Sequence, residues 1–309
     1  MSMCHARFVH ELADRLLPVL DAGRSLVVAT AVGLDGRMPR TLGTSMAWDG
    51  SAAIGSIAGG CIEGAIVEVA ERVLDDGRTR VVTFGVSDAD ALAVGLACGG
   101  RVDLHLALVN PADAVVGRLR EGADIPFTAQ GFGGGEPLFV DRVEPPTRLV
   151  VIGAMEFSAA LSTAAQAAGF AVTVVDPREL FLTAERFPGA ELVVAWPPGA
   201  LAGLGIDART AICHLGHDDR YDADLLEAAL ASPAFYVGAL GSRRTTEKRR
   251  VALAERGVDD SRLHAPIGLD LGATTPAETA ISILAEVLAV RAGRLPEPLR
   301  ATAGRVRAV

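Results

Sequence analysis

The fold of the second half of the chain is decided by the stretch Arg148-Leu149-Val150-Val151-Ile152-Gly153-Ala154-Met155-Glu156-Phe157-Ser158. Arg148 to Gly153 is an almost continuous apolar run, which is typical of a strand buried on both faces. Met155 to Ala168 is rich in small residues and stops at Gly169, as helices commonly do. A second buried strand is expected at Ala171 to Asp176. Strand, helix and strand in this order predict two parallel neighbours in one sheet.

The same alternation continues to the end of the chain. Further strands are expected at Leu192–Trp196, Thr210–Leu215 and Phe235–Leu240, and helices at Asp222–Ala231, Arg243–Arg256 and Pro276–Arg291. The sequence Thr275-Pro276-Ala277-Glu278 fits a capping box with proline at the first helical position. Buried strands alternating with helices predict an α/β fold, a parallel sheet covered on both faces.

The first turn of this region lies where a Rossmann phosphate loop would lie, and Asp176 ends the next strand, where an acid binds ribose. The residues depart from the dinucleotide pattern, because only Gly153 of its glycines is present. Met155 replaces a glycine that permits backbone approach to pyrophosphate, and Glu156 adds negative charge. Gly153 and Asp176 are therefore candidate binding residues for a nucleoside, while tight NAD(P) binding is not expected.

The first half of the chain has an α+β pattern whose strand order the sequence does not give. Helices are expected at about His5–Ala22 and Ile62–Asp76, and strands at Ser25–Ala31, Ala52–Ile57, Arg80–Phe84 and Val102–Leu108. Proline and glycine are dense between residues 111 and 147, which favours loops or short hairpins. We therefore expect an N-terminal domain at 1–110, a connecting segment at 111–147 and a C-terminal domain at 148–309.

Composition excludes several classes of protein. The formal net charge of −9 and the aromatic content of 5% argue against nucleic-acid binding, which needs clustered positive charge and stacking surfaces. The uncharged stretch Phe157–Val175 contains serine, threonine, glutamine and glycine, so no membrane span is expected. No signal peptide is recognisable, and the four cysteines form no C-x-x-C pair. We therefore expect a cytoplasmic protein with reduced thiols.

Two turns place a cysteine next to paired glycines. Gly59-Gly60-Cys61-Ile62-Glu63 follows an expected strand and begins an expected helix, where free N–H groups attract anions and favour a thiolate. The negative charge of Glu63 opposes a second anion there. Cys98-Gly99-Gly100 precedes another expected strand. The two turns are candidates for one shared ligand site, and the alternative for the first is a tight strand-to-helix turn that holds an inert, buried cysteine.

Three further segments carry candidate ligand contacts. Gly241-Ser242-Arg243-Arg244 places two cations at a helix start, which is unfavourable unless an anion is bound there; the alternative is that both arginines point to solvent or pair with carboxylates. His217 and Asp218, with Asp222 nearby, follow a strand and suit an acid/base or metal site, or merely a loop and a helix cap. Gly268 and Asp270 lie in a glycine-spaced loop that wraps either a ligand or the next helix.

In this order, these segments resemble the XdhC/CoxI family over nearly the whole chain. The resemblance rests on the Pro39-Arg40 segment, the two cysteine turns, the Gly-Ser-Arg-Arg turn, and the run from Ala265-Pro266-Ile267-Gly268 to Ser282-Ile283-Leu284-Ala285-Glu286. It implies an N-terminal XdhC/CoxI domain and a C-terminal Rossmann-like domain. Many relatives have Gly-Ala-Gly-His at the first Rossmann turn and a threonine at position 216, where this chain has Met155, Glu156 and Gly216.

The resemblance further implies a molybdenum cofactor chaperone. Such a protein binds molybdopterin as cargo, supports addition of its sulfido ligand, and delivers it to an apo-hydroxylase of the xanthine or carbon monoxide dehydrogenase type. Arg40, Cys61, Glu63, Cys98, Arg243, Arg244 and Asp270 match family positions, and His217, Asp218 and Asp222 match a family His-Asp segment. Further expected partners are a cysteine desulfurase and a second copy of the chain. Two other functions stay open: an NAD(P)-dependent oxidoreductase, separable by its NAD(P)H affinity, and a nucleotide sensor with no delivery role.

Overall fold

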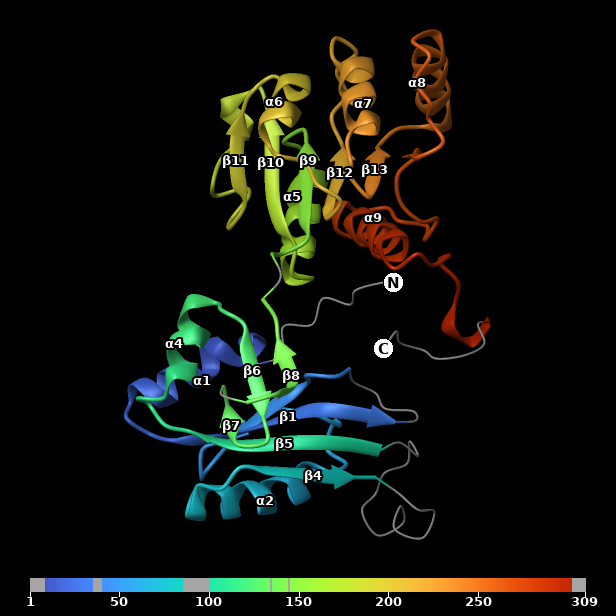
Figure 1. Ribbon diagram of the computed structural model, residues 1–309. Helices are drawn as coiled ribbons and strands as arrows, with labels where there is room; N and C mark the ends of the chain where they lie inside the picture. The colour runs from blue at the N-terminus through green and yellow to red at the C-terminus, as the bar shows by residue number, and fades with distance from the viewer. Residues whose placement is uncertain (1–8, 36–40, 86–100, 134, 144, 302–309) are drawn as a thin grey trace. The chain divides into compact units, whose positions relative to one another are not determined.

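The computed structural model describes residues 9–35, 41–85, 101–133, 135–143 and 145–301. The chain divides into two compact units, with the division between residues 144 and 145. Figure 1 shows the first unit from blue to green and the second from yellow-green to red. The candidate residues Arg40, Cys98, Gly99 and Gly100 lie outside the described residues.

The first unit is built on an antiparallel five-stranded sheet of order β3-β2-β1-β5-β4. Its strands are β1 (Leu26–Asp35), β2 (Ser45–Trp48), β3 (Ala53–Gly55), β4 (Arg80–Phe84) and β5 (Arg101–Val109). Helix α2 (Glu63–Asp76) packs on one face through its apolar side, Ile66, Val69, Ala70 and Val73. A short 3-10 turn (His10–Leu12), α1 (Ala13–Asp21) and α4 (Ala114–Glu121) are associated with the other face.

The segment at 111–147, expected as a connection, folds largely as part of this first unit. It contains α4 and a small antiparallel sheet of order β7-β6-β8, made of β6 (Ile125–Thr128), β7 (Gly131–Phe132) and β8 (Pro137–Asp141). Ile125 and Phe127 are fully buried in the core beneath α1 and α4. Because these side chains bury against the sheet, the Pro/Gly-rich segment is held by packing and does not act as a linker over its length.

The second unit is a six-stranded parallel sheet of order β11-β10-β9-β12-β13-β14. Its strands are β9 (Arg148–Ile152), β10 (Ala171–Asp176), β11 (Glu191–Val194), β12 (Thr210–His214), β13 (Tyr236–Ala239) and β14 (Leu263–His264). This order, 3-2-1-4-5-6 in chain sequence, is that of the doubly wound dinucleotide-binding fold. The expected α/β fold class, an α+β region followed by a Rossmann-like domain, is confirmed.

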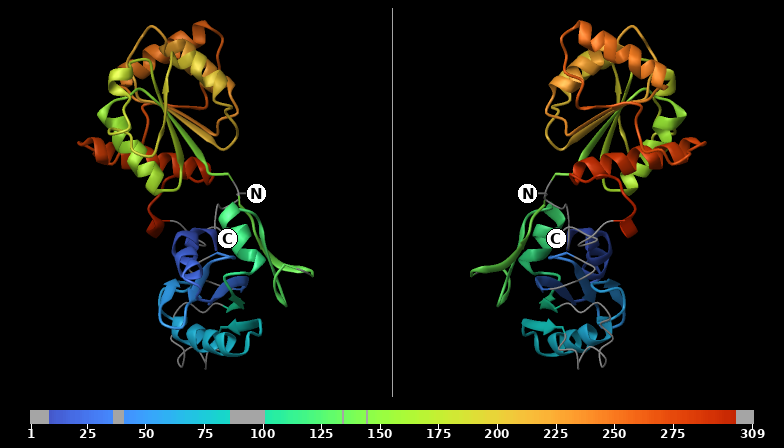
Figure 2. Two further views of the ribbon diagram at one scale, coloured as in Figure 1. Left: turned by 90° about the vertical axis from the view of Figure 1, so that its left-hand side faces the viewer. Right: turned by 90° about the vertical axis from the view of Figure 1, so that its right-hand side faces the viewer.

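Helices cover both faces of this sheet, as Figure 2 shows. Helices α5 (Glu156–Ala167) and α9 (Pro276–Arg291) bury Leu161 and Ile283 against the strand residues Leu149 and Val151. Helices α6 (Pro197–Gly203), α7 (Asp222–Ala231) and α8 (Arg243–Glu255) cover the opposite face, where Val150 and Ile152 point. The alternation of Leu149, Val150, Val151 and Ile152 explains why β9 is one apolar run in the sequence. The remaining short elements are 3-10 turns at Glu179–Phe181 and Leu299–Ala301.

The capping box at the start of α9 is present as expected. The Thr275 hydroxyl accepts the N–H of Glu278, and the Glu278 carboxylate accepts the N–H of Thr275. This reciprocal pair satisfies two N–H groups that the helix start would otherwise leave without partners. Within the described ranges, no helix is long and apolar enough to cross a membrane.

Candidate functional site

In the first unit, the loop Ser56–Ile62 folds around the carboxylate of Glu63. Oε1 of Glu63 accepts the hydroxyl of Ser56 at 2.7 Å and the N–H groups of Ile57 and Ala58 at 3.1 and 2.8 Å. Oε2 accepts the N–H groups of Gly60 and Ile62 at 2.8 and 3.2 Å. Although partial burial opposes ionisation, these donors lower the pKa of Glu63 to about 2.

This arrangement changes the expected role of the Gly59-Gly60-Cys61 turn. The N–H groups that we expected to attract an external anion already bind the carboxylate of Glu63, so Glu63 organises the loop. Helix α2 begins at Glu63, so Cys61 precedes the helix by two residues. The side chain of Cys61 is exposed, as are Gly59 and Gly60. The turn therefore presents a thiol at the surface on a backbone fixed by one carboxylate.

The other described cysteine, Cys213, lies in the core of the second unit on β12. Full burial raises the pKa of its thiol far above the usual value, and the nearby charge of Glu286 adds to the effect. Cys213 is therefore a packing residue. In the ranges that the structure describes, no group of three or more His, Cys, Asp or Glu residues could hold a metal ion.

In the second unit, Gly153 and Gly216 meet just beyond the carboxyl ends of the paired strands β9 and β12. A Cβ at Gly153 would lie 2.8 Å from the nitrogen of Gly216, and Gly153 has φ of +101°. Leu215 and Gly216 both donate their N–H groups to the carbonyl of Ile152. These strands form the topological switch point of the sheet, the place where ligands bind in open α/β folds. Gly153 is needed there for close backbone approach, whatever ligand is bound.

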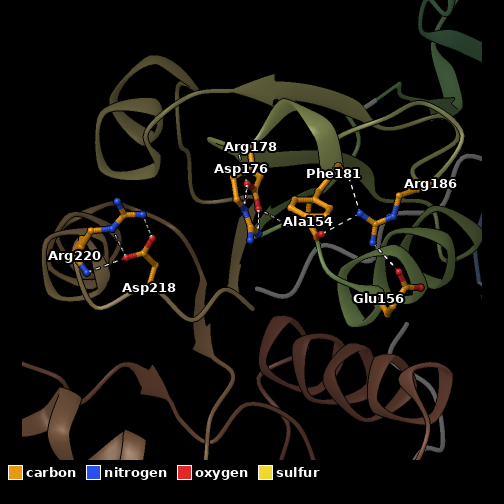
Figure 3. A network of polar contacts seen from close by, with 8 residues as sticks. All are labelled: Ala154, Glu156, Asp176, Arg178, Phe181, Arg186, Asp218 and Arg220. Atoms are coloured by element: carbon orange, nitrogen blue, oxygen red, sulfur yellow. Dashed lines mark hydrogen bonds and ion pairs between the residues drawn. The ribbon is translucent and has the colours of Figure 1, made fainter.

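Asp176, at the end of β10, is buried and engaged by four donors. Its carboxylate accepts the N–H of Ala154 at 2.7 Å and the backbone N–H, Nε and Nη2 of Arg178 at 2.8, 2.9 and 2.8 Å. Although burial opposes ionisation, the hydrogen bonds from Arg178 and Ala154 lower the pKa of Asp176. Figure 3 shows this pair at the centre of the carboxyl edge. Sequence reasoning missed Arg178, although a basic residue two positions after the expected ribose acid was visible.

Glu156, in the first turn of α5, does not stand alone at the phosphate loop. Arg186 donates from Nη2 to the Glu156 carboxylate at 2.7 Å and from Nη1 to the carbonyls of Ala154 and Phe181 at 3.2 and 2.8 Å (Figure 3). The negative charge that we expected to repel an anion is therefore paired with a guanidinium group. Met155, which precedes α5, keeps a side chain at the position of the second glycine.

The predicted cluster of His217, Asp218 and Asp222 does not form. His217 is exposed, and Asp218 binds Arg220 through two guanidinium hydrogen bonds of 2.9 and 2.6 Å. Asp222 turns inward and accepts Nε2 of the buried His214 at 2.6 Å. Burial lowers the pKa of His214, against the raising effect of Asp222. The sequence signal was His214 itself, a polar residue in an otherwise apolar strand.

The Gly241-Ser242 turn is held from behind by Arg249, another residue that sequence reasoning missed. Arg249 donates from Nη1 to the carbonyl of Leu240 at 2.8 Å and from Nε and Nη2 to Asp222, each at 2.7 Å. Ser242 caps α8 by accepting the N–H of Thr245 at 3.1 Å. Arg243 and Arg244 are both exposed in the first turn of α8. The buried cation therefore fixes the turn, while the two candidate cations face outward.

The loop containing Gly268 and Asp270 is packed on α9. Glu286 accepts the N–H of Gly268 at 2.8 Å and the hydroxyl of Tyr236 at 2.5 Å, and Ser282 donates to the carbonyl of Leu269 at 2.5 Å. A Cβ at Gly268 would lie 2.6 Å from the Ser282 hydroxyl oxygen. Of the two alternatives for this loop, the structure contains the one in which it wraps the next helix. Asp270 is exposed.

The candidate residues thus fall into two groups. Gly153, Asp176, Asp218 and the Gly241–Arg244 turn follow parallel strands of one sheet, so they lie at its common carboxyl edge, and Gly268 and Asp270 follow β14. Gly59, Gly60, Cys61 and Glu63 belong to the first unit. Fold and site therefore define a two-unit protein with an exposed thiol turn in one unit and a Rossmann-type sheet in the other.

Comparison with known proteins identifies the family. Residues 19–85 match the family described as XdhC and CoxI, and residues 149–287 match the XdhC Rossmann domain. The chain belongs to the XdhC/CoxI family and carries its Rossmann domain.

Several relatives are similar over most of their length. A protein of Bacillus subtilis named as a probable xanthine dehydrogenase subunit is 24% identical over 91% of this chain and 97% of its own. The "Molybdenum cofactor insertion chaperone PaoD" of Escherichia coli is 28% identical over 88% of this chain and 85% of its own. A crystal structure of a xanthine dehydrogenase from Bacillus halodurans has the same fold, with a TM-score of 0.76 at 24% identity, covering 96% of this chain and 98% of that one.

Proposed function

We propose that this chain is a molybdenum cofactor-binding accessory protein. In this role it protects the cofactor, supports its sulfuration and delivers it to a xanthine dehydrogenase-family hydroxylase. The observation that carries the proposal is the exposed Cys61 thiol on the turn fixed by Glu63. The similarity to the insertion chaperone PaoD supplies the identity of the cargo.

The chemistry of the cargo suits these residues. Molybdopterin has a dithiolene, an oxidisable metal end and a phosphate. An exposed thiol on a rigid turn is available to the sulfur and metal end. Taken by itself, the exposed Arg243-Arg244 turn of the second unit suits a phosphate group through charge-assisted hydrogen bonds. Both groups lie on open turns, which favours release of a cargo to an acceptor. In this proposal Cys61 contacts the cargo, and Glu63 positions Cys61.

Delivery is tested by activating an apo-hydroxylase anaerobically with cofactor-loaded protein. Cys61→Ser and Glu63→Gln should both reduce the initial rate of activation, because one removes the thiol and the other weakens the hydrogen bonds that hold its turn. Glu68→Gln is the matched control, since Glu68 is exposed on the same helix and should leave the rate unchanged. Activation by free cofactor at the same rate as by loaded protein would contradict a delivery role.

A further inference from the structure

Two aromatic side chains are left exposed beside arginines at the carboxyl edge of the parallel sheet. Trp196, one of only two tryptophans in the chain, is 45% exposed, and Phe181 is 40% exposed. The guanidinium carbon of Arg220 lies 5.4 Å from the Trp196 ring centroid, and that of Arg178 lies 4.8 Å from the Phe181 ring centroid. Large exposed aromatics with cations stacked on them are a common feature of ligand sites.

These residues come from three loops at the carboxyl edge of the sheet, two on one side of the switch point and one on the other. Arg178 follows β10, Trp196 follows β11, and Arg220 follows β12. Tyr221 joins two of the loops, because its ring meets the Trp196 ring edge-on at 5.0 Å between centroids. In folds of this strand order, nucleotides bind outside the carboxyl ends of these strands. The aromatic and cationic groups therefore surround a region where a base and its ribose would lie.

The state of Asp176 decides which kind of ribose fits. An ionised carboxylate offers about four lone-pair sites, and Asp176 already accepts four hydrogen bonds. Its side chain is only 1% exposed. It therefore has no free acceptor for the hydroxyls of an unmodified ribose, which is the usual task of an acid at this position.

Arg178 has hydrogen-bond donors that remain free for a ligand. A guanidinium group has five N–H donors, and the hydrogen bonds to Asp176 use two of them. The Arg178 side chain is 55% exposed, and Figure 3 shows it on the carboxyl edge facing the loop that carries Asp218 and Arg220. A group beside the ribose position would therefore meet donors, which suits a phosphate in place of a hydroxyl.

We propose that Arg178 and Trp196 form a subsite for a ribose-phosphorylated nucleotide, with the phosphate at Arg178 and the base against Trp196. Arg220 and Tyr221 position the Trp196 ring. The subsite does not require the phosphate loop at Met155 and Glu156, so it takes the nucleoside end of a ligand without requiring a nicotinamide cofactor. It is separate from the thiol turn of the first unit and does not rest on the proposed function.

The test uses the full chain with Trp48→Phe, so that Trp196 is the only tryptophan and its fluorescence reports directly on this subsite. The probes are adenosine 2′,5′-bisphosphate and adenosine 5′-diphosphate, which carry two phosphates each but differ in whether the ribose bears one at the 2′ position. The bisphosphate should quench Trp196 and bind about tenfold more tightly or better, as expected for one additional charge-assisted hydrogen bond. Equal affinities, or no quenching by the bisphosphate, would overturn the proposal.

Variants assign the effect to the residues named. Arg178→Lys keeps a cation beside Asp176 but removes the fork, so most of the preference for the bisphosphate should disappear. Arg250→Gln is the matched control on an exposed arginine of α8 and should leave the preference unchanged. If Arg178→Lys did not fold, the ratio of the dissociation constants of the two nucleotides, measured on the Trp48→Phe chain, would still test the proposal. A chain that activates a hydroxylase but does not distinguish the nucleotides would overturn this inference and leave the proposed function standing.

Discussion

Arg249, on α8, places its Nε and Nη2 atoms 2.7 Å from the carboxylate of Asp222, the first residue of α7. The Arg249 side chain is 4% exposed, and that of Asp222 is 15% exposed. The same carboxylate accepts Nε2 of His214, so one acid joins a strand and two helices behind the carboxyl edge. The ends of the loops that carry Asp218 and Ser242 are therefore held in place, even though the tips of these loops are exposed.

Replacing Arg249 should strongly destabilise the second unit. Arg249→Met leaves the buried charge of Asp222 without its main cationic partner, and loss of one partner of a buried ion pair costs about 3–5 kcal/mol. Denaturant unfolding followed by Trp196 fluorescence in the Trp48→Phe background measures this loss. Arg250→Gln, one position along the same helix but exposed, should change the free energy of unfolding by about 0.5 kcal/mol or less. Similar effects of the two substitutions would contradict a structural role for the Arg249–Asp222 pair.

The burial of His214 predicts a pH dependence of stability. Burial lowers its pKa in the folded state below the ordinary value of 6.5, so the unfolded state binds more protons as the pH falls below 6.5. The free energy of unfolding should therefore have its highest value above this pH and decrease below it. For this histidine the decrease is at most about 1.4 kcal/mol per pH unit. His214→Gln should make the decrease shallower, whereas His217→Gln, at an exposed position, should not. An unchanged slope in His214→Gln would show that other groups cause the dependence.

The two described cysteines should react very differently with a thiol reagent. Cys61 is exposed, whereas Cys213 is fully buried and its pKa is raised by burial. In the native protein near neutral pH, Cys61 should be labelled rapidly and Cys213 only at the rate of unfolding. Mass spectrometry of labelled peptides measures both rates, and a denatured sample provides the control. Rapid native labelling of Cys213 would contradict its placement in the core.

Arg243 and Arg244 should contribute to binding the phosphate of the cargo. Each substitution by alanine should weaken molybdopterin binding by about 1.5–3 kcal/mol, the usual range for hydrogen bonds to charged groups. Neither side chain is buried, so the fold should be retained. The alternative, in which both arginines only face solvent, predicts unchanged binding and a small gain in stability, because a cation is unfavourable at a helix N-terminus.

The sheet of the second unit could be predicted from sequence because each strand is a short apolar run between helices. Val150 and Ile152 face one helical layer and Leu149 and Val151 the other, so the pattern at β9 is unambiguous. The first unit was harder to predict. Strand β1 pairs antiparallel with β5, which lies far from it in the chain, and β2, at Ser45–Trp48, was not expected although the turn dipeptide Asp49-Gly50 follows it directly. Strand β6 packs into a core through the buried side chain of Phe127, and the spacing of apolar residues in the sequence does not reveal this burial.

The candidate site was only partly predictable for the same reason. Gly153, Asp176 and Asp218 could be placed at one edge because they follow or end parallel strands. The partners Arg178 and Arg220 lie two positions after Asp176 and Asp218 and were visible in the sequence, whereas the Arg249–Asp222 pair joins residues 27 positions apart and was not predictable. Glu63 was expected to disfavour an anion at the thiol turn, because sequence does not show that a carboxylate in the first helical turn folds back onto the preceding loop. Side-chain direction was the missing information in each case.

Binding of molybdenum cofactor at the thiol turn is the central claim made for this chain. Its most direct test is anaerobic titration of the purified full-length protein with molybdopterin, alongside Cys61→Ser and the Glu68→Gln control. We predict binding at about one to one with a dissociation constant of about 1 μM or lower, weakened about tenfold or more in Cys61→Ser and unchanged in the control. Folded protein that binds no molybdopterin, or binds it equally well without the Cys61 thiol, would contradict the claim.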